Sequence, residues 1–96
     1  MINDKETNPD FPSLEEIKKL PPDEAIKILD VLITIDTDNE EAYLIRGMKY
    51  WSMNVYGKAV NDYHVALRIN PSGKARALLD YANEVLNYYN KDLLNP

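Results

Sequence analysis

The sequence predicts an all-α fold of antiparallel helical hairpins, with about five helices joined by short turns. Apolar residues recur at spacings of three and four along residues 56–69 and along the other long segments, which is the pattern of a helix with one buried face. Small and apolar residues also recur with a period of 34, because Ala25 and Leu29 precede Ala59 and Tyr63 by that distance. A repeat of this length is typical of stacked helical hairpins. No segment shows the strict alternation that indicates a β-strand.

Length and composition set broad limits on the protein. The chain has 96 residues, a net charge of −5 and no cysteine, so we expect one domain without disulfide bonds. The acidic charge argues against nucleic acid as a partner, because phosphate binding needs clustered Lys and Arg. The N-terminus lacks the pattern of a signal peptide, and the longest uncharged apolar stretch, residues 31–35, is too short to cross a bilayer. We therefore expect a cytoplasmic protein without a membrane partner.

The chain is expected to begin with a flexible tail and a short helix. Residues 1–12 contain two prolines and few apolar side chains, so we expect them to form a tail that precedes a folded domain over residues 13–96. Ser13 and Glu16 have the spacing of a capping box, in which each side chain accepts a hydrogen bond from the other residue's backbone N–H. The first helix is therefore expected to start at Ser13.

Prolines and acidic residues delimit the next two helices. The prolines at 21–22 end the first helix and open the second, since a proline ring is tolerated in the first turn of a helix but not in its interior. The second helix is expected to stop near residues 36–39, where polar residues cluster. Asp38 with Glu41 repeats the capping-box spacing and is expected to start the third helix, which Asn54 ends.

The last two helices carry clear apolar patterns. A fourth helix is expected over residues 56–69 and is closed by Pro71. Ser72 is expected to cap a fifth helix, because a serine hydroxyl accepts a hydrogen bond from the first turn. We expect this helix to end near Tyr89 and residues 90–96 to fray.

Residues 40–73 contain small, aromatic and proline positions at fixed spacings. They are Tyr43, Arg46, Gly47, Tyr50, Ala59, Tyr63, Ala66 and Pro71. In these spacings the segment resembles one full tetratricopeptide repeat. The resemblance implies a partial repeat over residues 13–37, with Thr37 in place of the closing proline, and a capping helix over residues 73–90, with Tyr81 in place of the glycine. It also implies a fragment of a right-handed α–α superhelix.

Arg46 is the main departure from the family pattern, which usually has leucine at this position. Asp62 follows sixteen residues later, on the partner helix of the same hairpin. Because a subset of the family resembles this chain in carrying both residues, we predict that Arg46 and Asp62 form an ion pair between the two helices. The alternative is that the Arg46 side chain extends to water alone.

In the family, the first helix of each hairpin lines a concave groove, and the resemblance assigns eight apolar residues to that face. They are Leu14, Ile17, Leu44, Met48, Trp51, Leu78, Ala82 and Val85. Leu44 and Met48 stand where relatives that hold a terminal carboxylate place Lys and Asn, so we expect an apolar or basic segment of another protein in the groove. The residues expected to contact it are Glu41, Leu44, Met48, Trp51, Leu78 and Val85.

The sequence leaves alternatives to an open groove. The same face could be ordinary core, covered by flanking helices or by Phe11 of the tail, since periodicity alone does not separate core from interface. It could also bind a second copy of the chain, because so few repeats bury only a small core. Tyr81 and Tyr88 share a face of the last helix. Together with Tyr89 they are expected to pack on the preceding hairpin with their hydroxyls in water, or otherwise to form an exposed aromatic strip.

The sequence contains no motif of a known catalytic or metal site. The absence of cysteine excludes a thiol nucleophile and a His/Cys zinc site. The single histidine, His64, is expected on the surface without a partner that orients it for catalysis. Residues 36–40 resemble the start of a calcium-binding loop, but Glu41 and Gly47 stand where that loop needs Gly and Glu. We therefore expect no enzyme activity, no cofactor and no metal.

Overall fold

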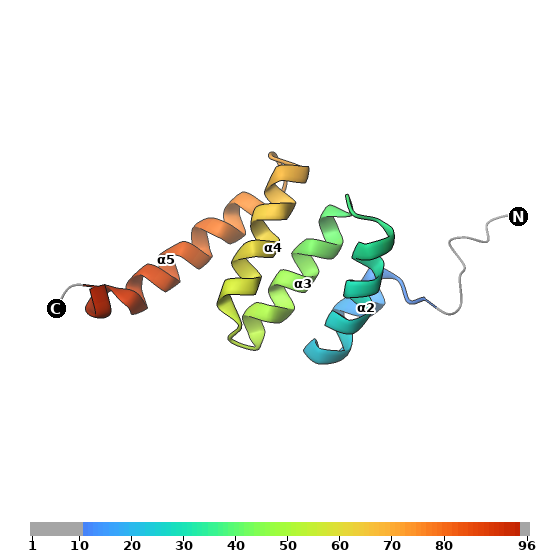
Figure 1. Ribbon diagram of the computed structural model, residues 1–96, viewed down its shortest axis with the longest axis horizontal. Helices are drawn as coiled ribbons and strands as arrows, with labels where there is room; N and C mark the ends of the chain where they lie inside the picture. The colour runs from blue at the N-terminus through green and yellow to red at the C-terminus, as the bar shows by residue number, and fades with distance from the viewer. Residues whose placement is uncertain (1–10, 95–96) are drawn as a thin grey trace, which may run out of the picture.

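The structure is a computed structural model that describes the backbone of residues 11–94 and the side chains of residues 11–89. Over this part of the chain the fold is all-α, with five helices and no strand. The helices are α1 (Leu14–Lys18), α2 (Pro22–Ile35), α3 (Glu40–Ser52), α4 (Tyr56–Ile69) and α5 (Ala75–Leu94) (Figure 1). Most of the expected N-terminal tail, residues 1–10, lies outside the described residues.

The starts of the first three helices depend on local capping. The capping box at α1 is confirmed: the Ser13 hydroxyl accepts from the Glu16 backbone N–H at 3.2 Å, and the Glu16 carboxylate accepts from the Ser13 N–H at 3.0 Å. Pro22 occupies the first position of α2, as expected. The expected capping box of Asp38 at α3 is wrong. Asn39 caps this helix instead, because its side-chain oxygen accepts from the backbone N–H of Ala42 at 3.1 Å.

The ends of the later helices differ in part from expectation. Asn54 follows α3 with a φ of 65°, a left-handed conformation that asparagine adopts more readily than most residues. Ser72 does not cap α5, because its hydroxyl donates to the side-chain oxygen of Asn70 at 3.2 Å and the helix begins only at Ala75. The backbone of α5 remains helical as far as Leu94, five residues beyond the expected end at Tyr89.

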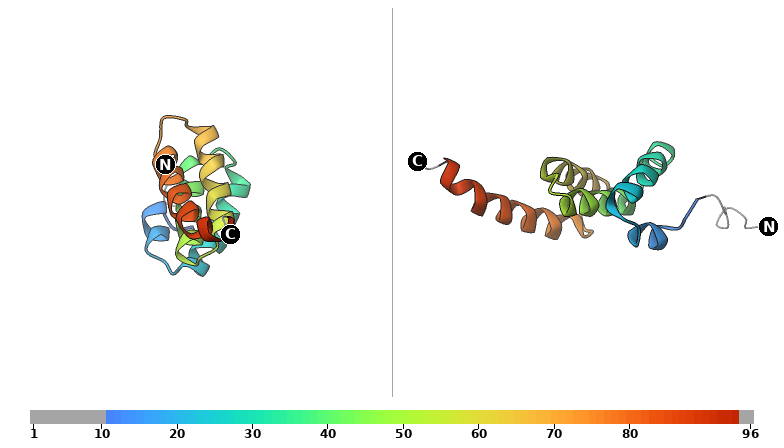
Figure 2. Two further views of the ribbon diagram at one scale, coloured as in Figure 1. Left: turned by 90° about the vertical axis from the view of Figure 1, so that its left-hand side faces the viewer. Right: turned by 90° about the horizontal axis from the view of Figure 1, so that it is seen from below.

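The helices form two layers of unequal extent. α1, α3 and α5 lie along one side of the molecule, and α2 and α4 lie along the other (Figure 2, right). Neighbouring helices in the chain pack against each other, and α1 also contacts α3. The first half of α5 lies beside α4, whereas its second half extends away from the other helices (Figure 1). This projecting half is the part of the fold with the least cover.

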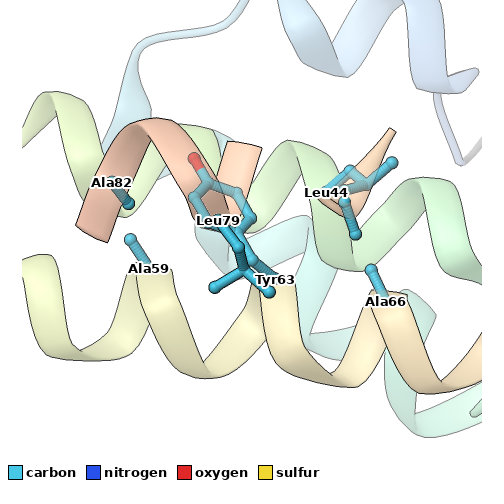
Figure 3. Packing of buried hydrophobic residues seen from close by; sticks show 7 residues of the cluster. Leu44, Ala59, Tyr63, Ala66, Leu79 and Ala82 are labelled. Carbon is cyan, nitrogen blue, oxygen red and sulfur yellow. The ribbon is translucent and has the colours of Figure 1, made fainter. Parts of the chain in front are cut away.

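Two apolar clusters hold the layers together, and α3 contributes to both. One cluster joins α1, α2 and α3 and contains Ile17, Ala25, Leu29, Ile33, Ala42 and Ile45. The other joins α3, α4 and α5 (Figure 3) and contains Leu44, Ala59, Tyr63, Ala66, Ala75, Leu79 and Ala82. Because Leu44 and Ile45 are adjacent in α3 but belong to different clusters, this helix is the centre of the core.

The glycine of the repeat pattern permits the close approach of α3 and α4. A Cβ atom on Gly47 would lie 2.6 Å from Cε1 of Tyr63 and 3.2 Å from the backbone oxygen of Ala59. The Tyr63 ring is itself buried, with only 3% of its surface exposed. A side chain at position 47 would therefore force the two helices apart or displace the ring.

Candidate functional site

Arg46 links three helices through carboxylates on both sides. Its Nε donates to Oδ2 of Asp62 at 2.9 Å, and its Nη2 donates to Oδ1 of the same residue at 2.8 Å. Its Nη1 donates to Oδ1 of Asp30 on α2 at 2.9 Å. The predicted pair with Asp62 is therefore confirmed, whereas the contact with Asp30 was not expected from the sequence.

The environment of Arg46 indicates a structural role. The hydrogen bonds to Asp62 raise the pKa of Arg46 above its ordinary value, against the opposite effect of burial. The guanidinium carbon also lies 5.6 Å from the ring centre of Tyr43 and 5.9 Å from that of Tyr50, within the range of a cation–π contact. Because two carboxylates already neutralise this cation, it offers little positive charge to a ligand.

A more open region lies on the side formed by α1, α3 and α5, which we call the α1–α3–α5 surface. It contains two hollows that share Met48. One, of about 150 Å³, is lined by Met48, Trp51, Tyr63, Leu78, Tyr81 and Ala82. The other, of about 320 Å³, is lined by Lys18, Ile45, Met48, Lys49 and Ser52. The smaller one, which we call the α3–α5 cavity, has an apolar and aromatic lining.

Aromatic contacts position the rings around the α3–α5 cavity. The Trp51 ring lies 4.6 Å from the ring of Tyr56 and 6.1 Å from the ring of Tyr81, measured between centroids. Tilted ring pairs at such distances are mutually attractive. An apolar cavity of about 150 Å³ in another protein accommodates benzene. The α3–α5 cavity therefore has room for one large apolar side chain.

The structure separates the expected contact residues into cavity and core. Met48, 40% exposed, lines the α3–α5 cavity together with the half-buried Trp51 and Leu78. The expectation for Leu44 is wrong, because this side chain is 1% exposed and packs in the α3–α4–α5 core. Val85 is half-buried on α5, one turn after Ala82, and does not line the cavity.

The two expected groove residues of α1 belong to the other cluster. Ile17 is fully buried between α1, α2 and α3, so its placement in a groove is wrong. Leu14 is half-buried and packs against the same cluster. The larger hollow on this side is thus bounded by the lysines at positions 18 and 49 rather than by these apolar residues.

Charged residues at the α1 end of this surface pair with each other. Glu41, expected at the rim of the groove, lies 3.6 Å from Nζ of Lys18. Lys49 donates to the backbone oxygens of Lys18 and Leu20 at 2.7 and 2.9 Å. These carbonyls lie at the last residue of α1 and two residues beyond it, near the C-terminal end of the helix, where a cation is favoured. Lys49 therefore fastens α1 to α3, a role that was not anticipated from the sequence.

Tyrosines of α5 are more exposed than expected. Tyr81, Tyr88 and Tyr89 expose 59%, 71% and 70% of their surface, and the rings of Tyr88 and Tyr89 meet edge to face at 5.3 Å. The expectation that Tyr88 packs on the preceding hairpin is wrong, because its side chain is exposed and the C-terminal half of α5 extends away from α4 (Figure 1). Tyr81 lines the α3–α5 cavity, a role that the sequence analysis did not assign to it. Its position one helical turn after Leu78, an expected groove residue, could have indicated this role.

The remaining features give no second site of comparable definition. Among the described residues, no three His, Cys, Asp or Glu side chains are grouped as metal ligands. His64 is exposed on α4. A wider hollow of about 690 Å³ between the α2–α3 turn and α4 is lined by both charged and apolar residues, among them Asp38 and Arg68. No helix in the described part of the chain is long and apolar enough to span a membrane.

Comparisons with known proteins add no relative. No family model matches the sequence, and no curated protein or solved structure matches it.

Proposed function

We propose that this chain is a small domain of the tetratricopeptide type that binds an apolar segment of another protein on its α1–α3–α5 surface. The observation that carries the proposal is the α3–α5 cavity, whose rim includes Met48 and Tyr81 at 40% and 59% exposure. Large apolar side chains beside an open apolar cavity are typical of a docking site.

Several structural details support membership of the repeat type. The approach of α3 and α4 at Gly47 gives a physical reason for the glycine of the pattern. Ala59 and Ala66 are fully buried where α4 meets its neighbours, so the small residues of the pattern also lie at contacts. The two-layer arrangement, with the first helix of each hairpin on one side, is the one that the resemblance implies (Figure 2).

The lining of the cavity favours an apolar partner over a basic one. Met48 can adapt to different shapes because its side chain is unbranched and flexible, and Trp51 offers a large rigid surface. The acidic residue expected to attract a basic segment, Glu41, lies 3.6 Å from Lys18 and is partly neutralised. We therefore propose a segment that inserts one large apolar side chain, such as Leu, Met or Phe, into the cavity.

Exposure also favours binding over the core-only alternative. If the apolar face were ordinary core, Met48 and Tyr81 would be covered, yet both are among the exposed large apolar residues of the described chain.

The cytoplasm as the compartment of this module stays a prediction from the sequence. Absence of catalysis likewise stays a prediction.

Selection from a displayed peptide library on the immobilised domain tests the proposal. We expect the selected peptides to share one large apolar residue and to lose binding to the Met48→Glu and Tyr81→Glu variants. His64→Glu is the matched control, because it places the same charge on an exposed position of α4 outside the cavity lining. The proposal fails if binding survives both cavity substitutions, or if neither a selected peptide nor a second copy of the chain binds at this surface.

A further inference from the structure

The apolar stripe of α5 continues beyond the part that the fold covers. Ala75, Leu79 and Ala82 are buried, and Leu86 and Tyr89 continue the same face at the spacing of three and four. Yet Leu86 is only half-buried and Tyr89 is 70% exposed. The projecting half of α5, residues 83–94, extends away from α4 in Figure 1 and in the right view of Figure 2. An amphipathic helix with an uncovered stripe needs a surface to bury it.

We infer that the apolar segment bound on the α1–α3–α5 surface is the projecting half of α5 from a second copy of this chain. The inference rests on the proposed function, since it names the occupant of the same cavity. Two copies then form an antiparallel dimer, in which each α5 inserts the aromatic part of its projecting half into the other copy's cavity.

The spacing along α5 suits such an exchange. Tyr81 lines the cavity and Tyr89 lies eight residues further along the helix, a distance of about 12 Å at 1.5 Å per residue. A two-fold axis halfway between them passes beside Val85. It brings Tyr89 of each copy to Tyr81 and the cavity of the other, so both overhangs are covered by one closed interface.

The exposed area is of the size that a dimer needs. Tyr81, Tyr88 and Tyr89 together expose the equivalent of about two tyrosine residues, or roughly 400 Å² at roughly 200 Å² each. A stable interface buries about 800 Å² on each partner. The tyrosines therefore supply about half of it, and the exposed parts of Met48, Val85 and Leu86 lie beside them to extend it.

The charges of α5 do not oppose this contact. Asp80 and Glu84 are exposed and, at 3.6 residues per turn, lie on the side of the helix opposite Ala82 and Leu86. They therefore lie outside the stripe of Ala82, Leu86 and Tyr89. Glu84, three residues after Tyr81 and four before Tyr88, borders the interface at these two rings. Antiparallel packing also brings opposite ends of the two helix dipoles together. Since each chain carries a net charge of −5, added salt weakens the repulsion between copies and strengthens the dimer.

The solution mass tests the inference. The chain has a mass of 11.1 kDa, and light scattering after size exclusion should give twice this value at concentrations about 100-fold apart. Tyr89→Glu should give a monomer with unchanged helix content. Asn87→Glu is the matched control, because it adds the same charge two residues away on the polar side of α5, and it should remain dimeric. A monomeric native chain, or equal behaviour of the two variants, overturns the inference.

Cross-linking tests the position of the axis. The chain has no cysteine. A single Val85→Cys substitution should therefore form a disulfide between the two residues at position 85 of the dimer under mild oxidation. Asn61→Cys, on the exposed side of α4, should not. A dimer that cross-links through Asn61→Cys, or through neither position, contradicts the α5 arrangement.

The two proposals fail separately. A native chain that stays monomeric but binds selected peptides through Met48 overturns the inference alone. A monomeric chain that binds no peptide overturns both. In the monomeric Tyr89→Glu variant, a synthetic peptide of residues 80–94 should bind and shift the emission of Trp51, the only tryptophan. Absence of that shift, with the variant still folded, contradicts the inference.

Discussion

Arg46→Met should destabilise the domain by about 3–5 kcal/mol, because it leaves the carboxylate of Asp62 buried without its partner. The side chain of Asp62 is 5% exposed and accepts two hydrogen bonds from the guanidinium of Arg46. For a chain of this length the whole free energy of unfolding is about 5–15 kcal/mol, so this single change removes a large part of it.

The reverse substitution should cost less. In Asp62→Leu, Arg46 keeps its hydrogen bond to Asp30 at 2.9 Å, and its side chain is already 20% exposed. The guanidinium can therefore turn toward water, and the loss should be about 1–3 kcal/mol, as for a buried hydrogen bond left unmade. This asymmetry follows from the different exposure of the two partners.

The double substitution completes the cycle. Replacing both partners, as Arg46→Met with Asp62→Leu, removes the buried charges together and should leave the stability within about 1 kcal/mol of the native value. Urea unfolding followed by far-ultraviolet circular dichroism measures all four proteins. Additive effects of the two single substitutions, or single effects below about 0.5 kcal/mol as for a surface pair, would refute the reasoning.

Three further predictions concern packing, capping and pH. Gly47→Ala should lower the unfolding free energy by about 1–2 kcal/mol, because crowding against Tyr63 outweighs the gain in helix propensity; an unchanged melting temperature would contradict this. Lys49→Met should speed amide exchange in α1, since it removes two hydrogen bonds to the carbonyls of Lys18 and Leu20; equal exchange rates would contradict it. Burial, with a smaller effect of a nearby carboxylate, raises the pKa of Tyr63 above 10.0. The folded state therefore favours the neutral phenol, and this contribution to stability is present below pH 10 and lost as the pH rises through the higher folded pKa. Urea unfolding at successive alkaline pH values should thus show Tyr63→Phe gaining stability relative to the native chain, and a constant difference would count against the assignment.

Much of the fold could be predicted from local sequence because its causes are local. The capping box of Ser13 and the proline at the start of α2 act within one helical turn. The pair of Arg46 and Asp62 was also accessible, because a hairpin of two antiparallel helices brings positions sixteen apart to one contact. The cap at Asn39 and the start of α5 at Ala75 were missed, since neighbouring polar residues compete for the same backbone N–H groups and their turn geometry decides among them.

Only part of the candidate site could be predicted from the sequence. The resemblance assigned Leu44 and Met48 to one face of α3 and treated the two residues as equivalent. In the structure Leu44 is 1% exposed and Met48 is 40% exposed, because Leu79 and Ala82 of α5 cover only part of that face. Lys49 gave no signal, since its partners are backbone oxygens of α1, about thirty residues away in sequence.

The sequence by itself determined that this protein is helical, where most of its helices begin and end, and which side of each helix is apolar. Those properties depend on side chains within a few residues of one another. Only the tertiary structure decided which apolar residues are core and which are surface, because cover comes from helices distant in the chain. It also decided that α5 leaves α4 and carries its stripe, with Tyr89, out to solvent, and from that departure the proposed partner follows.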